Sequence, residues 1–187
     1  KEDKFSSRKT ENIEAKVKIA KKAVDLIETG RSIFLDSGTT TMCLAELIPD
    51  QDLSIITSGP NIGMEIIDKN SPSVTIIGGQ LNRTNISVSG PNAIKFVENI
   101  NIDIAFMGVS AFSLENGFTS GNYSEGQLKN NIINKARKVI VLMDSSKIDK
   151  NMPFTFAEPE DIDVLVCEND LPDDIYKNIR GKGVKVL

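Results

Sequence analysis

A glycine-centred run of hydroxyl-bearing residues is the first feature of the chain that could bind a ligand. The run and the acid before it are Asp36, Ser37, Gly38, Thr39, Thr40 and Thr41. Apolar residues at helical spacing follow, so the run would stand at a helix start, where N–H groups, the helix dipole and side-chain hydroxyls favour a phosphate oxyanion. Ordinary helix capping explains the same residues. Because the run matches neither GxxxxGKS nor GxxxxGKT, it gives no support for nucleoside triphosphate hydrolysis.

Two lysines could balance the charge of such an anion. Lys129 stands on a predicted helix over residues 124–137, four residues after Glu125 and therefore on the same face of that helix. Lys147 follows a predicted strand directly. A solvated surface position is the usual fate of a lysine, and it is the alternative for both.

Short apolar runs predict the strands that would position these residues. They lie at 33–35, 53–56, 74–77, 102–107, 139–143, 164–167 and 184–187. Runs of β-branched and aliphatic residues that alternate with helix-sized stretches indicate a mainly parallel sheet with helices on both faces. The predicted fold class is α/β.

Five of these strands end in small or hydroxyl-bearing residues. Besides the run after the first strand and Lys147 after the fifth, the candidates are Thr57, Ser58, Gly78, Gly79, Gly108 and Ser110. The carboxyl ends of parallel strands lie along one edge of the sheet, where open α/β proteins bind ligands. We therefore expect the five loops to converge on one pocket, although Gly, Ser and Asp are also common in plain turns.

The composition excludes several kinds of chemistry. The chain has no His, which rules out Ser/His/Asp and Cys/His catalysis and imidazole-ligated metals. Its two cysteines, Cys43 and Cys167, stand in apolar settings and are predicted to be buried thiols rather than a metal pair or a disulfide. Without Trp and with 5% aromatic residues, a platform for stacking nucleobases is not expected.

Length, charge and hydropathy bound the remaining choices. The chain has 187 residues, 40% of them hydrophobic, which suits one soluble domain. We find neither a run long enough to span a bilayer nor a signal-peptide pattern, so we expect a cytoplasmic protein without a membrane partner. The net charge is −4, and the basic residues concentrate in the first 31, which contain nine Lys or Arg and six Asp or Glu. The acidic remainder should not bind nucleic acid by itself.

The front of the chain is predicted to differ from the rest. Residues 1–9 are polar and without periodicity, which indicates a linker, and residues 10–187 form the predicted domain. Thr10 could cap a helix that ends at Gly30. The apolar stripe of that helix consists of Ile13, Val17, Ala20, Val24 and Ile27. The stripe would pack on its own domain or pair two subunits.

Several short motifs occur together in a recognisable order. They are IFLDSGTTT at 33–41, IITSGPN at 55–61, IIGGQ at 76–80, SGPNA at 89–93, DIAFMGVS at 103–110, GFTS at 117–120, EGQLK at 125–129 and MDSSK at 143–147. In this order they resemble the C-terminal effector-binding domain of DeoR-family transcriptional regulators, over roughly residues 11–170.

The resemblance implies a fold and a ligand class. That family is similar to ribose-5-phosphate isomerase and CoA-transferase folds, which implies a Rossmann-like sheet whose edge binds a phosphorylated sugar. It also implies a homo-oligomer, either dimer or tetramer, with no cofactor, and a repressor or regulator that binds DNA through a winged helix-turn-helix domain of about 60 residues in front of this chain. Residues 1–9 would then be the remnant of the linker after that domain.

The resemblance also assigns roles to individual residues. Asp36 to Thr41 match the phosphate-binding loop, and Lys129 matches a helix lysine that meets an anionic or hydroxyl group of the ligand. Lys147 matches the D-x-S-K segment. Thr57, Ser58, Gly78, Gly79, Gly108 and Ser110 match positions at the pocket edge.

The same comparison argues against catalysis. Where the isomerases have an acidic pair in a D-G-A-D-E stretch, this chain has MGVSA at 107–111. Glu125 and Lys129 could nominally act as base and enediolate stabiliser, but one carboxylate and one lysine are a thin basis for isomerisation. We therefore predict a sensor domain rather than an enzyme. A small sugar-phosphate isomerase, or a domain that only oligomerises, are the alternatives.

Overall fold

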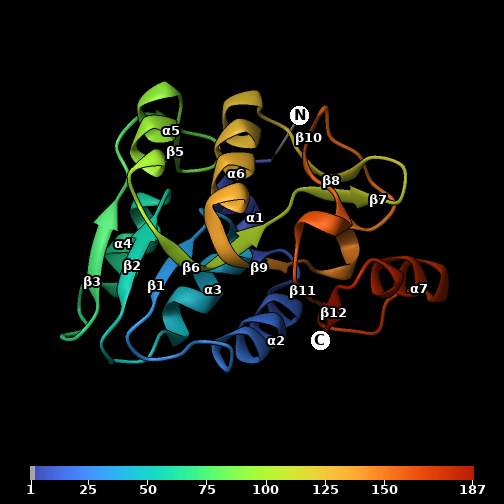
Figure 1. The fold of residues 1–187 in the computed structure, drawn as a ribbon, viewed down its shortest axis with the longest axis horizontal. Coiled ribbons are helices and arrows are strands. Elements are labelled where there is room, and N and C mark those ends of the chain that lie inside the picture. The colour runs from blue at the N-terminus through green and yellow to red at the C-terminus, as the bar shows by residue number, and fades with distance from the viewer. Residues whose placement is uncertain (1–2) are drawn as a thin grey trace.

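All seven predicted strands pair into one parallel sheet, which confirms the predicted α/β class (Figure 1). The computed structural model describes residues 3–187. The strands are β1 (Ser32–Leu35), β2 (Ser54–Thr57), β3 (Ser73–Ile76), β6 (Ile102–Gly108), β9 (Ala136–Leu142), β11 (Val164–Val166) and β12 (Lys185–Val186). Their order across the sheet is β12-β11-β9-β6-β1-β2-β3.

The register of the central strands brings the predicted loops together. Leu35, the last residue of β1, lies opposite Thr57 of β2 on one side and Phe106 of β6 on the other. Gly108, the last residue of β6, lies opposite Leu142 of β9. The loops that leave β1, β6 and β9 therefore start next to one another at the same edge of the sheet.

Helices cover both faces of the sheet, as the alternating pattern predicts. On one face lie α2 (Ile13–Val24), α3 (Thr39–Leu47) and α4 (Pro60–Ile66), and on the other α5 (Pro91–Glu98), α6 (Tyr123–Lys135) and α7 (Asp173–Gly181). Two apolar cores result, one on each side, and alternate residues of the buried strands feed them: Phe34 and Ala105 pack into one core, Ile33 and Phe106 into the other. Figure 1 shows α5 and α6 on one side of the strands and α2 and α3 on the other.

Two small antiparallel sheets were not predicted. One contains β7 (Ala111–Ser113), β8 (Gly117–Ser120) and β10 (Phe154–Ala157), and the other is a hairpin of β4 (Gln80–Asn82) and β5 (Ser87–Ser89). Their strands have only three or four residues, several of them polar, so they show little of the alternation that marks a strand in sequence. The hairpin is fixed to the main sheet by Val88, whose N–H donates to the carbonyl of Ser58 at 2.8 Å.

Most of the segment predicted to be a linker, residues 1–9, is helical. Residues 1 and 2 lie outside the described part of the chain, but α1 (Phe5–Thr10) is helical and Phe5 is buried against the core that contains α2 and α3. Two short 3-10 turns, Ser145–Lys147 and Pro159–Asp161, complete the regular structure.

The predicted helix over residues 10–30 is also shorter than expected. Thr10 ends α1 instead of capping the next helix, and α2 begins at Ile13 after Asn12, which has a φ of 52°. Asn tolerates this left-handed conformation better than most residues, and it breaks the helix there. The helix ends at Val24, ahead of Gly30.

The buried face of α2 is rotated from the predicted stripe. Ile19, Ala20 and Ala23 are fully buried, whereas Ile13 is 44% exposed. Lys16 is buried as well, at 2% exposed. The rotation arises because α2 packs mainly against α3 and also contacts β9 and β11 of the sheet, so residues on two adjacent faces of the helix are covered.

Both cysteines are buried free thiols, as the sequence predicts. Burial raises the pKa of Cys167 to about 12 and raises the pKa of Cys43 as well. These thiols therefore stay protonated at neutral pH, and they pack as small apolar groups. Among the described helices, none combines the length and the apolar character needed to cross a membrane.

Candidate functional site

A polar cavity lies where the loops after β1, β6 and β9 meet. Ten of the fifteen candidate residues line it: Asp36, Ser37, Gly38, Thr39, Thr40, Gly108, Ser110, Glu125, Lys129 and Lys147. The cavity is partly open to solvent and has a volume of about 40 Å³. A cavity of this size is small compared with the pockets that enclose a whole sugar phosphate, and it suits a small polar group such as a phosphate.

The start of α3 forms one wall of the cavity. Gly38 is the N-cap residue in an extended conformation, and no side chain caps the helix. The first hydrogen bond of the helix runs from the Met42 N–H to the Gly38 carbonyl at 3.0 Å. Within residues 3–187, no acceptor is recorded for the N–H groups of Thr39, Thr40 and Thr41. The sequence left side-chain capping as the alternative to a ligand site, but no side chain accepts hydrogen bonds from the N–H groups of this helix start.

A buried ion pair forms the floor of the cavity. The Lys129 ammonium donates to Asp36 Oδ2 at 2.6 Å and to the Gly108 carbonyl at 2.7 Å. The same Asp36 oxygen accepts the Gly108 N–H at 2.9 Å. This arrangement ties the ends of β1 and β6 to α6. Lys129 also lies 5.0 Å from the ring centroid of Phe156.

Lys129 keeps one donor for a ligand after these two bonds, because an ammonium group has three. It is 9% exposed, not solvated as most lysines are, and Asp36 is 3% exposed. Because the Asp36 carboxylate neutralises the Lys129 charge, net attraction for an anion has to come from other groups around the cavity.

Glu125 is held by donors from the β4–β5 hairpin. Its carboxylate accepts hydrogen bonds from Asn82 at 3.3 Å and from Asn85, whose amide reaches both oxygens at 3.0 and 2.9 Å. A further short bond comes from the Ser87 hydroxyl. Glu125 stands one helical turn before Lys129, so the two line the cavity from one face of α6, as the spacing predicts.

Three residues that line the cavity were not predicted: Arg8, Asn85 and Val109. Arg8 comes from α1, inside the stretch interpreted as a linker, and donates from Nη2 to Asn85 Oδ1 at 3.1 Å. The only sequence signal for a packed segment there is Phe5, a lone aromatic residue among polar ones. Asn85 stands in the short hairpin that the sequence pattern did not reveal.

Five candidate residues do not line the cavity. Thr57 instead joins strand ends: its hydroxyl donates to the Leu35 carbonyl at 2.7 Å and accepts the Gly59 N–H at 3.0 Å. Ser58 holds the hairpin, as described above. The others are Thr41, Gly78 and Gly79.

Gly79 and Thr41 have positions that explain their residue types. Gly79 has a φ of 156°, and a Cβ there would lie 2.6 Å from the Ser89 carbonyl oxygen, so it allows the close approach inside the hairpin. Thr41 is fully buried beneath the cavity wall, and its Oγ1 has no hydrogen-bond partner in the described part of the chain. A Cβ on Gly38 or on Gly108 would stand 3.7 Å from this oxygen, so Thr41 lies directly behind both glycines.

A second buried charge lies behind the cavity. The Lys16 ammonium donates to the Arg8 carbonyl, which fastens α1 to α2. Burial lowers the pKa of Lys16, and the Asp144 carboxylate acts in the opposite direction. Asp144 follows β9, is 2% exposed and caps the turn that carries Lys147 through the Ser146 N–H at 3.1 Å.

No group of three or more His, Cys, Asp or Glu side chains within residues 3–187 is arranged to hold a metal ion. The chemistry of the cavity is therefore that of N–H donors, hydroxyls and ammonium or guanidinium groups around two carboxylates. Such a set can bind an oxyanion together with neighbouring hydroxyl groups.

Comparison with known proteins matches most of the chain to a family. Residues 11–169 match the family model described as "DeoR C terminal sensor domain". The chain is 33% identical over 187 residues to the HTH-type transcriptional regulator GlpR of Haloferax volcanii, covering 100% of this chain and 73% of that protein. It is 32% identical over 177 residues to a putative aga operon transcriptional repressor of Escherichia coli O157:H7, covering 94% of this chain and 66% of the relative.

Solved structures show the same fold. Ribose 5-phosphate isomerase A from Methanocaldococcus jannaschii superposes with a TM-score of 0.54 at 19% sequence identity, over 73% of this chain and 55% of the isomerase chain. The present chain thus spans about half the length of that enzyme. At this identity the likeness concerns the Rossmann-like fold and not the activity.

Proposed function

The chain belongs to the family of DeoR C-terminal sensor domains, and we propose that its polar cavity binds the phosphate group of a phosphorylated sugar. The phosphate would lie against the N–H groups of Thr39 to Thr41, and the sugar hydroxyls would face Ser110, Glu125 and Lys129. The observation that carries the proposal is a helix start, without a side-chain cap, that faces a cavity of phosphate size together with a lysine that has a donor to spare.

The arrangement of the charged groups supports sensing rather than isomerisation. An aldose–ketose isomerase needs a base that moves a proton between adjacent carbons and a group that stabilises the enediolate. Here Glu125 is engaged by three side chains of the hairpin, and Lys129 is engaged by Asp36. We propose that the bound metabolite is recognised and released unchanged.

In the whole protein, we propose that ligand binding changes DNA binding by an N-terminal winged helix-turn-helix domain, within a homo-oligomer. The curated relatives are named as transcriptional regulators or repressors, which supports this view. A ligand can shift the arrangement of such domains only if it binds one arrangement more tightly than another.

Calorimetric titration with a panel of pentose and hexose phosphates, and with the corresponding unphosphorylated sugars, tests the ligand class. At least one phosphorylated sugar should bind, and its unphosphorylated counterpart should bind far more weakly. Thr40→Val, which removes one hydroxyl at the cavity wall, should weaken binding, with a loss of about 0.5–1.5 kcal/mol. Thr75→Val on the exposed edge strand β3 is the matched control and should bind as the parent does. Equal affinity for a phosphorylated sugar and its unphosphorylated counterpart would refute the proposal.

Incubation with the same sugar phosphates, followed by a ketose assay, tests the enzymatic alternative. The sensor hypothesis predicts no turnover. Turnover that Glu125→Gln abolishes would establish the isomerase alternative instead.

A further inference from the structure

We infer that the open edge of strand β3 is the surface at which two copies of this chain pair, β3 against β3 in antiparallel orientation. The line along which the two strands meet is called the seam below, and the outer side of helix α4 covers it on one face. The inference names a contact surface for the homo-oligomer of the proposed function, and it does not depend on the phosphate site.

Strand β3 ends the main sheet with one side unpaired. It pairs with β2 alone among the strands of residues 3–187, and it is the outermost element at the left of Figure 1. The N–H groups of Ser73 and Ile77 donate to carbonyls on the β2 side, at 2.9 and 3.0 Å. Since alternate residues of a strand direct their main-chain groups to opposite sides, Val74 and Ile76 direct theirs away from the sheet.

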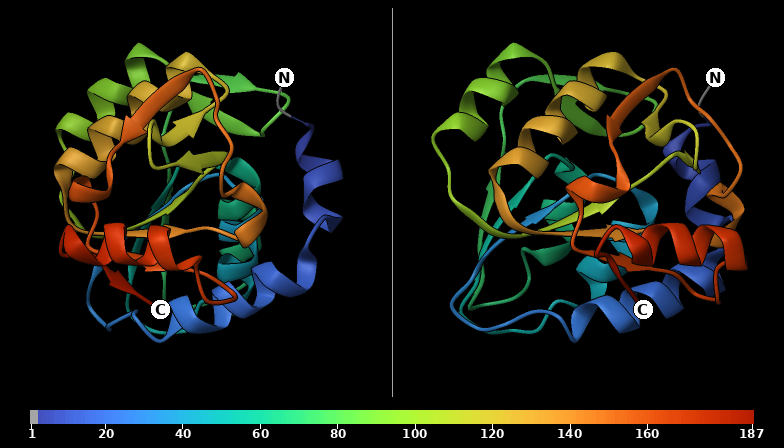
Figure 2. Two further views of the ribbon diagram at one scale, coloured as in Figure 1. Left: turned by 90° about the vertical axis from the view of Figure 1, so that its right-hand side faces the viewer. Right: turned by 45° about the vertical axis from the view of Figure 1, so that its right-hand side comes forward.

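The other edge of the sheet differs from this one. Strand β12 has two residues, and one of them, Lys185, is exposed. Figure 2, which turns this edge toward the viewer, shows α7 in front of it. Short strands, lysines and covering helices keep sheet edges from pairing. Strand β3 has four residues instead, and residues 70–77 contain no charged side chain that would repel a second copy.

Two copies of β3 satisfy each other when they pair about a twofold axis at Thr75. Val74 of each copy then lies opposite Ile76 of the other, and residues opposite each other in such a pair exchange two N–H···O=C hydrogen bonds. Thr75 meets its own copy on the axis, where a Thr–Thr pair is favourable. Pro72 has no N–H, so the seam begins after it.

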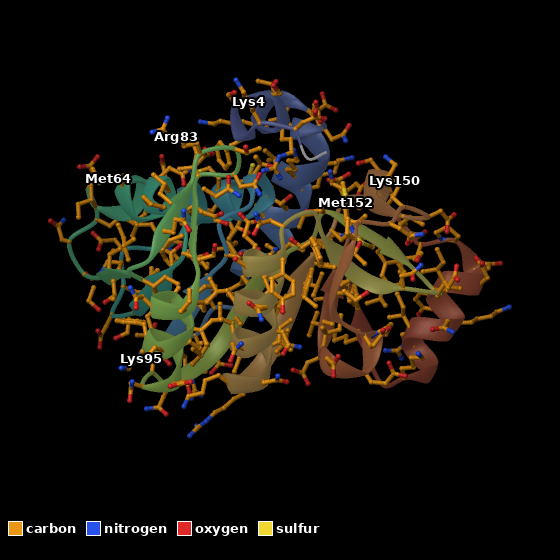
Figure 3. The ribbon with its side chains drawn as sticks, turned by 90° about the horizontal axis from the view of Figure 1, so that it is seen from above. Lys4, Met64, Arg83, Lys95, Lys150 and Met152 are labelled. Carbon is orange, nitrogen blue, oxygen red and sulfur yellow. The ribbon has the colours of Figure 1, made fainter. Side chains whose placement is uncertain are left out.

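An apolar patch flanks the open edge on the side of α4. The helix lies close to β3 at Gly63, where a Cβ would stand 2.8 Å from Ile76 and 3.5 Å from Val74. Ile67 follows Gly63 by one helical turn, and Met64 precedes Ile67 by three residues, so both flank this contact. Met64, Ile67 and Ile76 are 63%, 58% and 41% exposed. Seen from above in Figure 3, Met64 lies at this end of the molecule.

The area of this surface fits a dimer that dissociates on dilution. The three exposed side chains present on the order of 300 Å² on each copy, the size of patch that marks an interaction site. Together with the main chain of β3, two copies would bury on the order of 1,000 Å², which is the lower limit for a specific interface and too little for a permanent one.

The apolar stripe of α2, the other surface considered for pairing, is used inside the domain. Ala20 is fully buried, and Val17, Val24 and Ile27 pack against the core that contains α3. Ile13 is the one residue of the stripe that is exposed, at 44%. The stripe therefore offers a second copy a single apolar side chain.

The turn before β3 holds the strand in position for pairing. Asp50 Oδ1 accepts the Ser71 N–H at 2.7 Å and the Asn70 N–H at 3.1 Å. These hydrogen bonds, with that from Ser71 first, lower the pKa of Asp50, so its carboxylate is ionised at neutral pH. A strand that is already ordered loses less conformational entropy when it pairs.

Sedimentation velocity over a range of concentrations tests the inference on this chain. The parent should be a dimer when concentrated and a monomer when dilute, with a Kd on the order of 1–100 μM. Ile76→Lys places a charge in the seam and should raise the Kd at least about 10-fold. Ile13→Lys is the matched control, because Ile13 is as exposed as Ile76 but lies on α2, and it should dimerise as the parent does.

Val74→Pro tests the main-chain hydrogen bonds of the seam. It removes an N–H that points away from β2, so it leaves the pairing within the sheet in place, as proline does on edge strands. The variant should also dimerise more weakly than the parent. Far-UV circular dichroism should show the parent fold for this variant and for Ile76→Lys.

Thr75→Cys tests the antiparallel register. Two cysteines that face each other on the axis have Cβ atoms about 4.5 Å apart, close enough for a disulfide across the seam. Both native cysteines are buried and have a raised pKa, so they do not compete. Oxidised glutathione should convert Thr75→Cys, but not Ile13→Cys, to a covalent dimer on a non-reducing gel.

The outcomes separate this inference from the proposed function. A parent that stays monomeric at every concentration overturns the inference, and so does a dimer that Ile76→Lys and Val74→Pro leave intact. A Thr75→Cys variant that does not cross-link overturns the antiparallel seam. Ile76 does not line the cavity, so Ile76→Lys should bind sugar phosphates as the parent does. A parent that dimerises through β3 but binds no sugar phosphate refutes the proposed function alone.

Discussion

Lys129 and Asp36 show how one residue pair can serve both the fold and the site. Their side chains are 11% and 4% exposed, so neither charge is well solvated. The pair joins α6 to the end of β1, and Lys129, which lines the cavity, makes only two hydrogen bonds with its three ammonium donors. A lysine with this position cannot be treated as a simple ligand contact, because its removal also leaves a buried carboxylate.

Removal of either partner should therefore destabilise the chain. Lys129→Met and Asp36→Asn are each expected to cost about 3 kcal/mol, since each leaves a buried polar partner unpaired. The double variant should cost less than the two single costs added together. Urea unfolding of the four proteins gives the comparison. Strictly additive losses would show that the two side chains do not interact.

For this reason, binding experiments on Lys129 variants require a stability control. Thr40→Val is the cleaner test of binding, because Thr40 is not part of the Lys129–Asp36 ion pair. The sequence identified Lys129, Glu125 and the run at 36–41 because their types and spacing carry the signal. It could not show that Asp36 and Lys129 neutralise each other, since these residues are 93 positions apart.

At the scale of elements, the paired strands β1 and β6 position the cavity at their carboxyl ends. A second carboxylate, that of Asp103, joins the two strands at their amino ends. Asp103 at the start of β6 accepts from the Ser32 N–H at 3.0 Å and from the Ser32 hydroxyl at 3.1 Å. The hydrogen bond from the Ser32 N–H lowers the pKa of Asp103 below its ordinary value of 3.8. The ionised form therefore contributes stability above that value and loses it as the pH falls through the lowered pKa.

Asp103→Asn should lower the free energy of unfolding by on the order of 1 kcal/mol at pH 7. The difference from the parent should shrink in strong acid, once the pH has fallen below the lowered pKa of Asp103 and the parent carboxyl is also neutral. Urea unfolding at the two pH values measures it. If Asp103→Asn lowers the free energy of unfolding by the same amount at both pH values, the charge of Asp103 does not stabilise the strand ends.

Local sequence specifies some of these elements strongly and others weakly. The central strands of the main sheet contain apolar runs because both of their faces are buried, and the sequence predicts these strands together with the more exposed edge strands β3 and β12. The hairpin and the three-stranded sheet depend on contacts with distant segments, as when Ser58 accepts from Val88, so their short strands carry no periodic signal. Helix α1 was missed for the same reason, because what orders it is Phe5 in a core formed by α2 and α3.

At the scale of the whole molecule, residues from six segments that are distant in sequence lie together at one edge of the sheet. The cavity receives residues from α1, the β1–α3 loop, the β4–β5 hairpin, the end of β6, α6 and the turn after β9. The strand-exit rule predicts the contributions of three of these. It does not predict that the exits of β2 and β3 turn away to support the hairpin, which is why Thr57, Ser58, Gly78 and Gly79 lie outside the cavity wall.

The fold alone leaves the activity open, since a similar architecture occurs in ribose 5-phosphate isomerase. Family membership identifies a sensor domain, and the central claim is then that the start of α3 receives the phosphate group of its ligand. Amide NMR during titration with sugar phosphates tests this most directly. We predict that the N–H resonances of Thr39, Thr40 and Thr41 shift together on saturation, in the direction expected for new hydrogen bonds to an anion. Saturable binding that leaves these three resonances in place, and moves resonances elsewhere, would contradict the account.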